Sequence, residues 1–156
     1  MDRRGLVDVE SLGAGIVVDM RYATSDNFIG TRLYDGRSAW LLATAAAKLA
    51  VAARLAAADG LRLVVLDAYR PLAAQALMWA ARPEPGFVAP PERGSNHNRG
   101  AAVDVTLADG IPVLRDGQTL RYRQVRLRET TVADERAAVR MAERVVDRLK
   151  LVTDAA

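Results

Sequence analysis

The sequence predicts an α+β fold in which a small antiparallel sheet is flanked by helices. Two observations support this prediction. Apolar residues recur at helical spacing in separate stretches of the chain, and short runs rich in β-branched residues lie between Gly and Pro turn signals. The 156 residues fit one compact domain. Because no linker, repeat or low-complexity tract interrupts them, we expect a single domain over residues 1–156.

Three helices are expected. Residues 39–58 place leucine and alanine at helical spacing, and Gly60 suits a C-terminal cap. Pro71 starts a second helix that runs to about residue 81, because proline is tolerated in the first turn. Thr131 caps a third helix that runs to about residue 150, with its apolar residues on one face.

Several short strands are expected between these helices. Asp109-Gly110 is typical of a tight hairpin turn, and Asp116-Gly117 indicates a second turn. Residues 82–94 hold four prolines, which forbid regular structure there. The expected strands are 15–20, 61–66, 101–107, 111–114 and 120–127.

The composition excludes several classes of protein. The chain is 51% apolar and 26% charged, which is normal for a soluble globular protein. It has no cysteine, so disulfides and thiolate metal sites are excluded. It has no run of about 18 apolar residues, so we expect no membrane partner. Asp8 and Glu10 interrupt any signal-peptide core, and we therefore expect a cytoplasmic protein.

The net charge of +3 is spread along the chain, with its densest run in the last third. Four arginines within eight residues can attract an anion or a nucleic acid. A solvated, arginine-rich surface strand explains the same pattern, and we prefer it. We therefore expect a small-molecule partner and no nucleic acid. The four residues are Arg121, Arg123, Arg126 and Arg128.

Three segments contain the residues best suited to chemistry. His97 lies in a Gly-containing loop and Asp104 in the strand that follows, so both can converge on one cation such as Zn²⁺. Taken alone, such a pair is more often a hydrogen-bonded turn. Arg70 follows a buried strand, where it can polarise a carbonyl oxygen or form a salt bridge to Asp67 or Asp19. The three segments are 18–28, 66–71 and 95–106.

Together these segments resemble the D-alanyl-D-alanine dipeptidases, the vancomycin-resistance type of zinc peptidase. The family patterns are DxxYATxDNFxG with a later tyrosine, DAYRP, and SxHxxGxAxDxT. The matching residues are 19–30 with Tyr34, then 67–71, then 95–106. Order and spacing both agree over about residues 15–107, and the combination is far more specific than any one block.

The resemblance implies a role for each matching residue. His97 and Asp104 correspond to two of three zinc ligands, if zinc is retained. Arg70 corresponds to the residue that stabilises the tetrahedral oxyanion, and Ser95 to a contact with the polar ends of the substrate. Arg70, His97 and Ser95 are therefore the expected catalytic residues. The expected pocket-wall or structural residues are Tyr22, Asn27 and Tyr34.

The resemblance ends after residue 107. The family carries a C-terminal E-x-x-H strand, whose His is the third zinc ligand and whose Glu is the general base. His97 is the only histidine of this sequence, so we expect a domain that lacks that strand. Residues 120–128 hold arginines where the family places an acid for the substrate's ammonium group. Four acidic residues could replace the missing ligand or base, but we prefer surface roles for them: Glu92, Glu129, Asp134 and Glu135.

We therefore expect an enzyme whose pocket is repurposed for metal-independent, non-hydrolytic chemistry on a small biosynthetic intermediate. Cyclisation, isomerisation and cycloaddition are the reactions considered, with no cofactor. One alternative is a zinc dipeptidase with a substituted third ligand or a strand supplied by a partner. Another is a non-catalytic binding protein or a decayed remnant. Since a missing strand would expose a sheet edge, we also expect a homodimer or a covering helix there.

Overall fold

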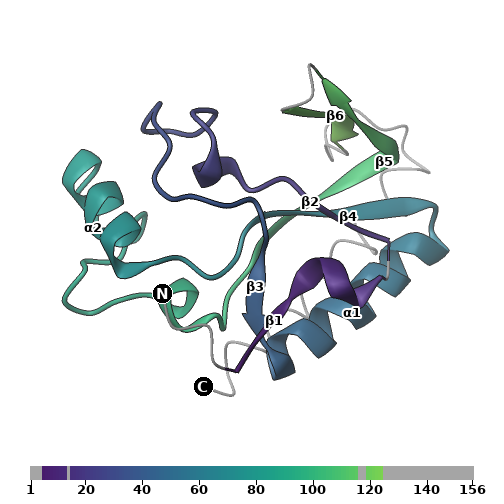
Figure 1. Ribbon diagram of the computed structural model, residues 1–156, viewed down its shortest axis with the longest axis horizontal. Coiled ribbons are helices and arrows are strands. Elements are labelled where there is room, and N and C mark those ends of the chain that lie inside the picture. The colour runs from purple at the N-terminus through teal and green to yellow at the C-terminus, as the bar shows by residue number, and fades with distance from the viewer. Residues whose placement is uncertain (1–4, 14, 116–118, 125–156) are drawn as a thin grey trace.

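The computed structural model describes residues 5–13, 15–115 and 119–124. These residues form a two-stranded sheet, a four-stranded sheet and two α-helices (Figure 1), so the predicted α+β class is confirmed. The small sheet contains β1 and β3, and the main sheet has the order β2-β4-β5-β6. The strands are β1 (Leu6–Asp8), β2 (Ile16–Val18), β3 (Trp40–Leu42), β4 (Leu61–Asp67), β5 (Asp104–Arg115) and β6 (Thr119–Gln124). The helices are α1 (Ala43–Ala58) and α2 (Leu72–Ala81), with 3-10 turns η1 (Val9–Leu12), η2 (Arg21–Ala23) and η3 (Asn96–Arg99).

The main sheet is built around the buried strand β4. On one side β4 pairs in parallel with β2, with Val64 opposite Val17. On the other side it pairs antiparallel with β5, with Val65 opposite Val105. The sheet is therefore mixed, because the connection from β2 to β4 contains α1 and brings the chain back in the same direction.

The N-terminal part of the predicted helix 39–58 is a strand. β3 pairs antiparallel with β1, and α1 begins only at Ala43. The backbone of this segment bonds to three distant parts of the chain: Ala39 O accepts from Val9 N at 2.8 Å, Leu42 N donates to Gly100 O at 2.9 Å, and Trp40 O accepts from Tyr69 N at 2.9 Å. These tertiary bonds use the groups that a helix would need for itself.

Helix α1 covers the main sheet with a face of small residues. Leu49 is fully buried, and such burial contributes about 1.5–3 kcal/mol. The helix ends at Ala58 with Asp59 as its C-cap, and Gly60 follows with φ 73°, as predicted for the C-terminal end. The other buried residues of α1 are Ala45, Ala46, Ala52, Ala53 and Ala56, and they pack in the same core cluster as Leu63 and Val65 of β4.

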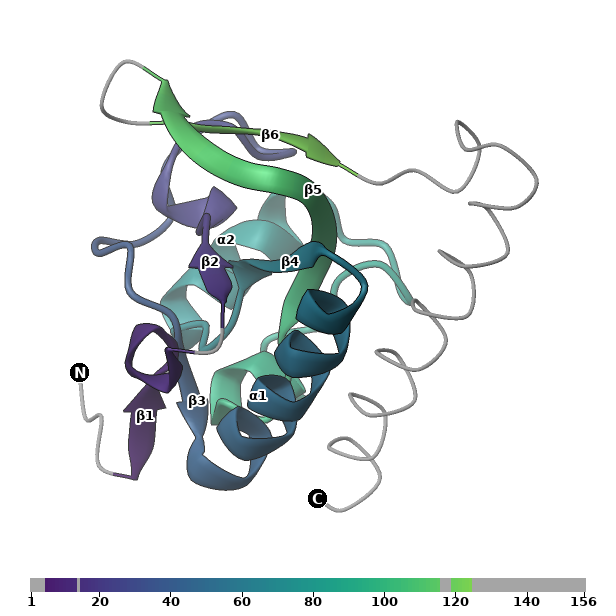
Figure 2. The ribbon, with the colours of Figure 1, turned by 90° about the vertical axis from the view of Figure 1, so that its right-hand side faces the viewer.

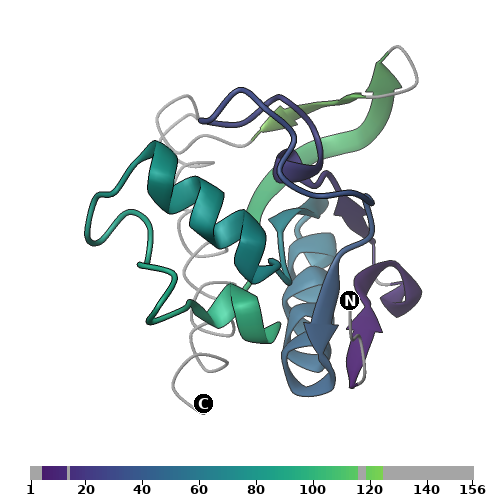
Figure 3. The ribbon, with the colours of Figure 1, turned by 60° about the vertical axis from the view of Figure 1, so that its left-hand side comes forward.

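Helix α2 lies apart from α1 (Figures 1 and 3). Pro71 is its N-cap rather than its first helical residue, with φ −59° and ψ 145°. The proline-rich segment 82–94 that follows contains no helix or strand, as predicted. Gln75 is the fully buried polar residue of α2, and its contacts are part of the candidate site.

The predicted turn at Asp109-Gly110 is wrong. β5 continues through these residues, and Figure 2 shows it as a long curved strand that carries β6 at its far end. Asp109 aligns with Leu61 of β4 on one side and with Arg123 of β6 on the other, so two neighbouring strands keep it extended. The pairing of β5 with β6 is irregular at this point, with a register shift between Asp109 and Val113.

Several predictions fall partly or wholly outside the described residues. They include the helix 131–150, Arg126 and Arg128, the turn Asp116-Gly117 and the absence of a C-terminal strand. The domain extent, the homodimer and the cytoplasmic location stay predictions. Within the part of the chain that the structure describes, no helix has the length and apolarity needed to cross a membrane.

Candidate active site

The site forms where the end of β4 meets η3. The segment that follows β4 contains Arg70, and η3 contains His97. Two hydrogen bonds join them: Arg70 N donates to His97 O at 3.0 Å, and Asn98 Nδ2 donates to Arg70 O at 2.8 Å. The second and third sequence motifs are therefore one structural unit.

The turn η3 is fixed at both ends. Ser95 Oγ accepts from His97 N at 3.1 Å, and Asn98 Oδ1 accepts from Ser95 N at 2.7 Å, which completes a capping box. Gly100 ends the turn with φ 71°, and a Cβ there would meet Leu6 Cδ2 at 2.8 Å. Ser95 thus has a structural role as a cap, and its expected contact with substrate stays a prediction.

The imidazole of His97 has a defined tautomer. Its Nδ1 lies 2.9 Å from the carbonyl oxygen of Ala68, which can only accept, so Nδ1 carries the proton. The lone pair of the neutral ring is therefore on Nε2, which lies 3.6 Å from Asp104 Oδ1. That distance is too long for a hydrogen bond. It suits two ligands of one cation, and a backbone carbonyl on the other nitrogen is the usual support of a metal-binding histidine.

Asp67 lies close enough to complete a group of three ligands, because ligand atoms of Asp67, His97 and Asp104 all lie within 4.8 Å of one another. Its carboxylate is already saturated, however. Oδ1 accepts from Tyr34 Oη at 2.8 Å and from Ala68 N at 3.0 Å. Oδ2 faces the Nδ1 edge of His97, at 3.6 Å, rather than the Nε2 edge. Of the three residues, His97 and Asp104 are therefore the two whose ligand atoms could meet one cation.

Oδ2 of Asp67 also holds Arg70, accepting from Nε at 2.9 Å and from Nη2 at 2.5 Å. This is one of the two salt bridges that the sequence allowed; the other candidate, Asp19, pairs with Arg21 at 2.8 Å. Arg70 Nη1 donates to Gln75 Oε1 at 2.8 Å. Three of the five N–H groups of the guanidinium thus donate to described residues. The other two can meet a ligand oxygen.

The charges of the site favour a protonated His97 beside an ionised Asp104. Burial lowers the pKa of the imidazole, but the neighbouring carboxylates of Asp104 and Asp67 outweigh it and leave the pKa raised. Burial raises the pKa of the Asp104 carboxyl, but His97 and Arg70 outweigh it and leave the pKa lowered. A metal ion at this pair would therefore compete with a proton for Nε2.

The predicted wall residues differ in what they do. The Tyr22 ring lies beside Arg70, whose Cζ is 5.4 Å from the ring centroid, and burial raises the pKa of its hydroxyl. The hydroxyl of Tyr34 is committed to Asp67. Asn27 organises its own loop, because Nδ2 donates to Thr24 O at 2.7 Å and Oδ1 accepts from Ile29 N at 2.9 Å. Its expected contact with substrate stays a prediction.

Two functional groups had little signal in the sequence. Asp67 belongs to the DAYRP block, but its spacing to Arg70 indicates only a simple salt bridge. Gln75 holds Arg70 through Oε1, and its Nε2 donates to Ala89 O at 2.7 Å. An amide in the middle of an apolar helix is the one clue that the sequence offers, since nothing in its spacing relates it to Arg70.

The site thus brings Nε2 of His97 near the carboxylate of Asp104, next to the buried Arg70. Comparison with known proteins gives the family. The family model described as D-ala-D-ala dipeptidase matches residues 2–140, and the chain belongs to this family.

Two curated relatives agree with this assignment. The D-alanyl-D-alanine dipeptidase of Escherichia coli K12 is 40% identical over 108 residues, which cover 69% of this chain and 56% of that protein. The D-alanyl-D-alanine dipeptidase of Enterococcus faecium is 32% identical over 126 residues, which cover 66% of this chain and 61% of that protein. The chain thus spans about three fifths of the length of these relatives.

Proposed function

We propose that this protein binds zinc through His97 and Asp104 and hydrolyses a short dipeptide of the D-alanyl-D-alanine type. One observation carries the proposal. The Ala68 carbonyl fixes the proton on Nδ1, so the lone pair of Nε2 faces the Asp104 carboxylate. Nitrogen and oxygen donors in this arrangement suit Zn²⁺. Both curated relatives carry the name of this activity.

The other residues of the site have roles that follow from their contacts. When bound, zinc supplies Lewis-acid polarisation and a more acidic water. Arg70 is held by Asp67 and Gln75 with two N–H groups left over, so it can donate to the oxygen that gains charge when the amide is attacked. Because Arg70 is held before substrate arrives, little reorganisation is needed.

The proposal requires a third ligand and a general base. The third ligand is not a second histidine of this sequence, because His97 is the only one. Glu92 is exposed and does not belong to the described group that can hold a metal. Glu129, Asp134 and Glu135 lie outside the described residues. A carboxylate from that segment, or a group from outside residues 1–156, would complete the site.

The single histidine favours a second candidate function, metal-independent and non-hydrolytic chemistry such as cyclisation, isomerisation or cycloaddition. Without a metal, the raised pKa of His97 makes its imidazole a proton donor next to Arg70. Such a site would bind a neutral or anionic intermediate. A non-catalytic binding role uses the same donors without turnover.

Metal content and turnover separate these candidates. The protein is purified without chelator, zinc per chain is measured by elemental analysis, and release of D-alanine from D-Ala-D-Ala is followed. We expect close to one zinc per chain in the parent, and loss of both zinc and turnover in His97→Ala and Asp104→Ala. The matched control is Asp35→Ala, whose side chain is 90% exposed, and it should keep both. A parent protein with neither zinc nor turnover contradicts the proposal and leaves the second candidate.

A further inference from the structure

A row of aromatic rings continues outward from the candidate active site. Tyr22 lies beside Arg70, whose Cζ is 5.4 Å from the centroid of the tyrosine ring. Phe28 contacts Tyr22 edge to face, with ring centroids 6.1 Å apart, and Phe87 contacts Phe28 in the same way at 5.3 Å. We call Tyr22, Phe28 and Phe87 the aromatic row. Its inner end meets the arginine of the site.

The two outer rings of the aromatic row are exposed. Phe28 is 41% and Phe87 is 50% exposed, whereas Tyr22 is half-buried. The two phenylalanines come from segments far apart in the sequence, and the fold brings them into contact. A single exposed apolar residue is common, but adjoining ones indicate a surface that contacts a ligand or a partner.

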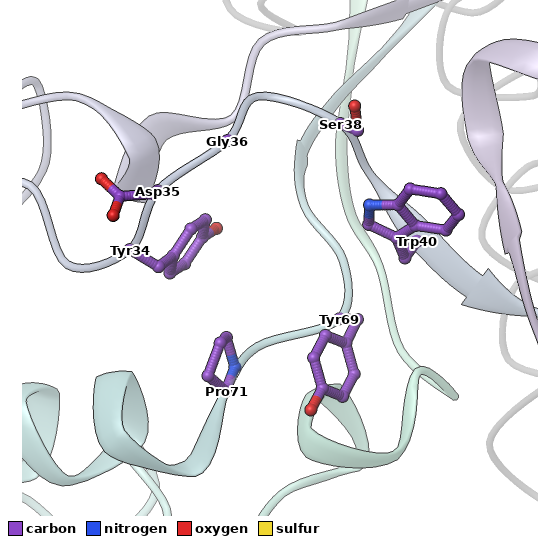
Figure 4. A pocket seen from close by; sticks show the side chains of 7 residues that line it. All are labelled: Tyr34, Asp35, Gly36, Ser38, Trp40, Tyr69 and Pro71. Carbon is purple, nitrogen blue, oxygen red and sulfur yellow. The ribbon is translucent and has the colours of Figure 1, made fainter. Parts of the chain in front are cut away.

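The loop that carries Phe28 is held at both ends. Leu33 N donates to Tyr22 O at 2.9 Å, which closes the loop onto η2. Tyr34 follows, and its hydroxyl donates to Asp67 at 2.8 Å. Figure 4 shows Tyr34 facing the start of α2 across a hollow. Because the loop is fixed before any ligand arrives, its phenylalanine ring loses little freedom when a ligand binds.

The segment that carries Phe87 is fixed as well. The neighbouring Val88 is buried, and the guanidinium carbon of Arg82 lies 4.0 Å from the centroid of the Phe87 ring. Gln75 Nε2 donates to Ala89 O at 2.7 Å, and the other end of the same amide holds the arginine of the site. One buried amide therefore joins this segment to the site.

A fixed apolar surface binds an apolar group because both are removed from water, and it needs no directed hydrogen bonds. Since the aromatic row begins beside Arg70, a substrate held there can place a side chain against the outer rings. We propose that Phe28 and Phe87 form a specificity subsite for a large apolar side chain of the substrate. This inference rests on the proposed hydrolysis and refines its substrate class. The substrates are dipeptides in which one of the two residues carries an aromatic or large aliphatic side chain.

The sequence contains two phenylalanines, and both belong to the subsite, which gives a direct test. Parent protein labelled with ¹³C in its phenylalanine rings reports on this pair alone, and Phe87→Leu assigns the two signals. The ligands are uncleavable reduced-amide analogues of D-Ala-D-Phe, D-Phe-D-Ala and D-Ala-D-Ala. We expect at least one of the two phenylalanine analogues to shift both ring signals saturably, and the D-Ala-D-Ala analogue to leave them in place.

Steady-state kinetics provide a second measurement. In the parent, kcat/KM should be higher for one of the phenylalanine dipeptides than for D-Ala-D-Ala. Phe87→Ala should lower this ratio about ten-fold, the effect of losing roughly half of the burial of one aromatic side chain. The matched control is Leu77→Ala, which removes an apolar side chain of similar exposure, 53%, outside the aromatic row. It should keep the ratio of the parent.

Failure of the subsite and failure of the proposed hydrolysis give different results. If no dipeptide is cleaved, the hydrolysis is wrong, and the ring signals still decide whether the pair takes an apolar side chain. If cleavage occurs with the same ratio in the parent and Phe87→Ala, the subsite is wrong. It is also wrong if the three analogues shift the ring signals alike. Ring signals that move with protein concentration alone indicate contact between copies and overturn the proposal. The parent titration decides even if Phe87→Ala does not fold.

Discussion

Replacement of Asp67 by asparagine tests whether the buried carboxylate is the anchor of the site. Asp67 and Arg70 form an ion pair with side chains 1% and 7% exposed. Asparagine keeps the shape but removes the charge, which leaves the guanidinium buried without a counter-ion. Breaking a buried pair in this way costs about 3–5 kcal/mol. With a urea m-value of about 2 kcal/mol/M, the unfolding midpoint should fall by about 1.5–2.5 M.

The chain contains a matched control for this substitution. Arg32 and Asp35 also form an Arg–Asp pair three residues apart, but their side chains are 64% and 90% exposed. Asp35→Asn should cost at most about 1 kcal/mol, because exposed pairs are screened by water. Both variants are compared with the parent by urea unfolding followed by circular dichroism. If Asp67→Asn loses no more stability than Asp35→Asn, the buried pair does not have the role assigned to it.

Three further predictions concern the same region, all measured by urea unfolding. Gln75→Leu should cost about 2–3 kcal/mol because it removes the partner of Arg70 Nη1; a loss within error of zero would mean that water replaces the amide. Gly100→Ala should cost more than Gly86→Ala, since both have positive φ but only Gly100 is in close contact; equal losses would show that the contact relaxes. Burial, with Asp67 adding to it, raises the pKa of Tyr34 above its usual 10, so the parent should lose stability as the pH rises beyond about 10, where the unfolded tyrosine ionises. Above that pH, the free energy of unfolding of Tyr34→Phe should fall by about 1.4 kcal/mol less per pH unit than that of the parent. Parallel curves of unfolding free energy against pH for the two proteins would refute this assignment.

The sequence alone was sufficient for the parts of the fold that depend on local chemistry. The C-terminal end of the helix that precedes Gly60, the buried strand that leads to Asp67 and the helix that follows Pro71 all appear close to their predicted bounds. Their signals are periodic apolar residues, a positive-φ glycine and a proline, each of which acts within one turn or strand. The family motifs likewise indicate His97, Asp104 and Arg70 through their order and spacing alone.

Errors arose where distant segments compete for the same backbone. Residues 40–42 have helical spacing, yet they form β3 because β1, Gly100 and Tyr69 take up hydrogen-bonding groups in or beside them. Asp109-Gly110 has the composition of a turn, yet β4 and β6 hold Asp109 between them. Local propensity is worth a fraction of a kcal/mol to about 1 kcal/mol per residue, so tertiary pairing overrides it.

The sequence by itself determined which residues can perform chemistry at this site, because the order and spacing of three motifs are visible in one dimension. Only the tertiary structure decided how those residues are arranged. It placed the Ala68 carbonyl on one nitrogen of His97 and Asp104 near the other. It also showed that Asp67 is occupied by Arg70 and Tyr34 rather than free for a metal. The tautomer of His97 and the number of hydrogen bonds that Asp67 accepts depend on which groups meet in space. The linear sequence does not contain those distances.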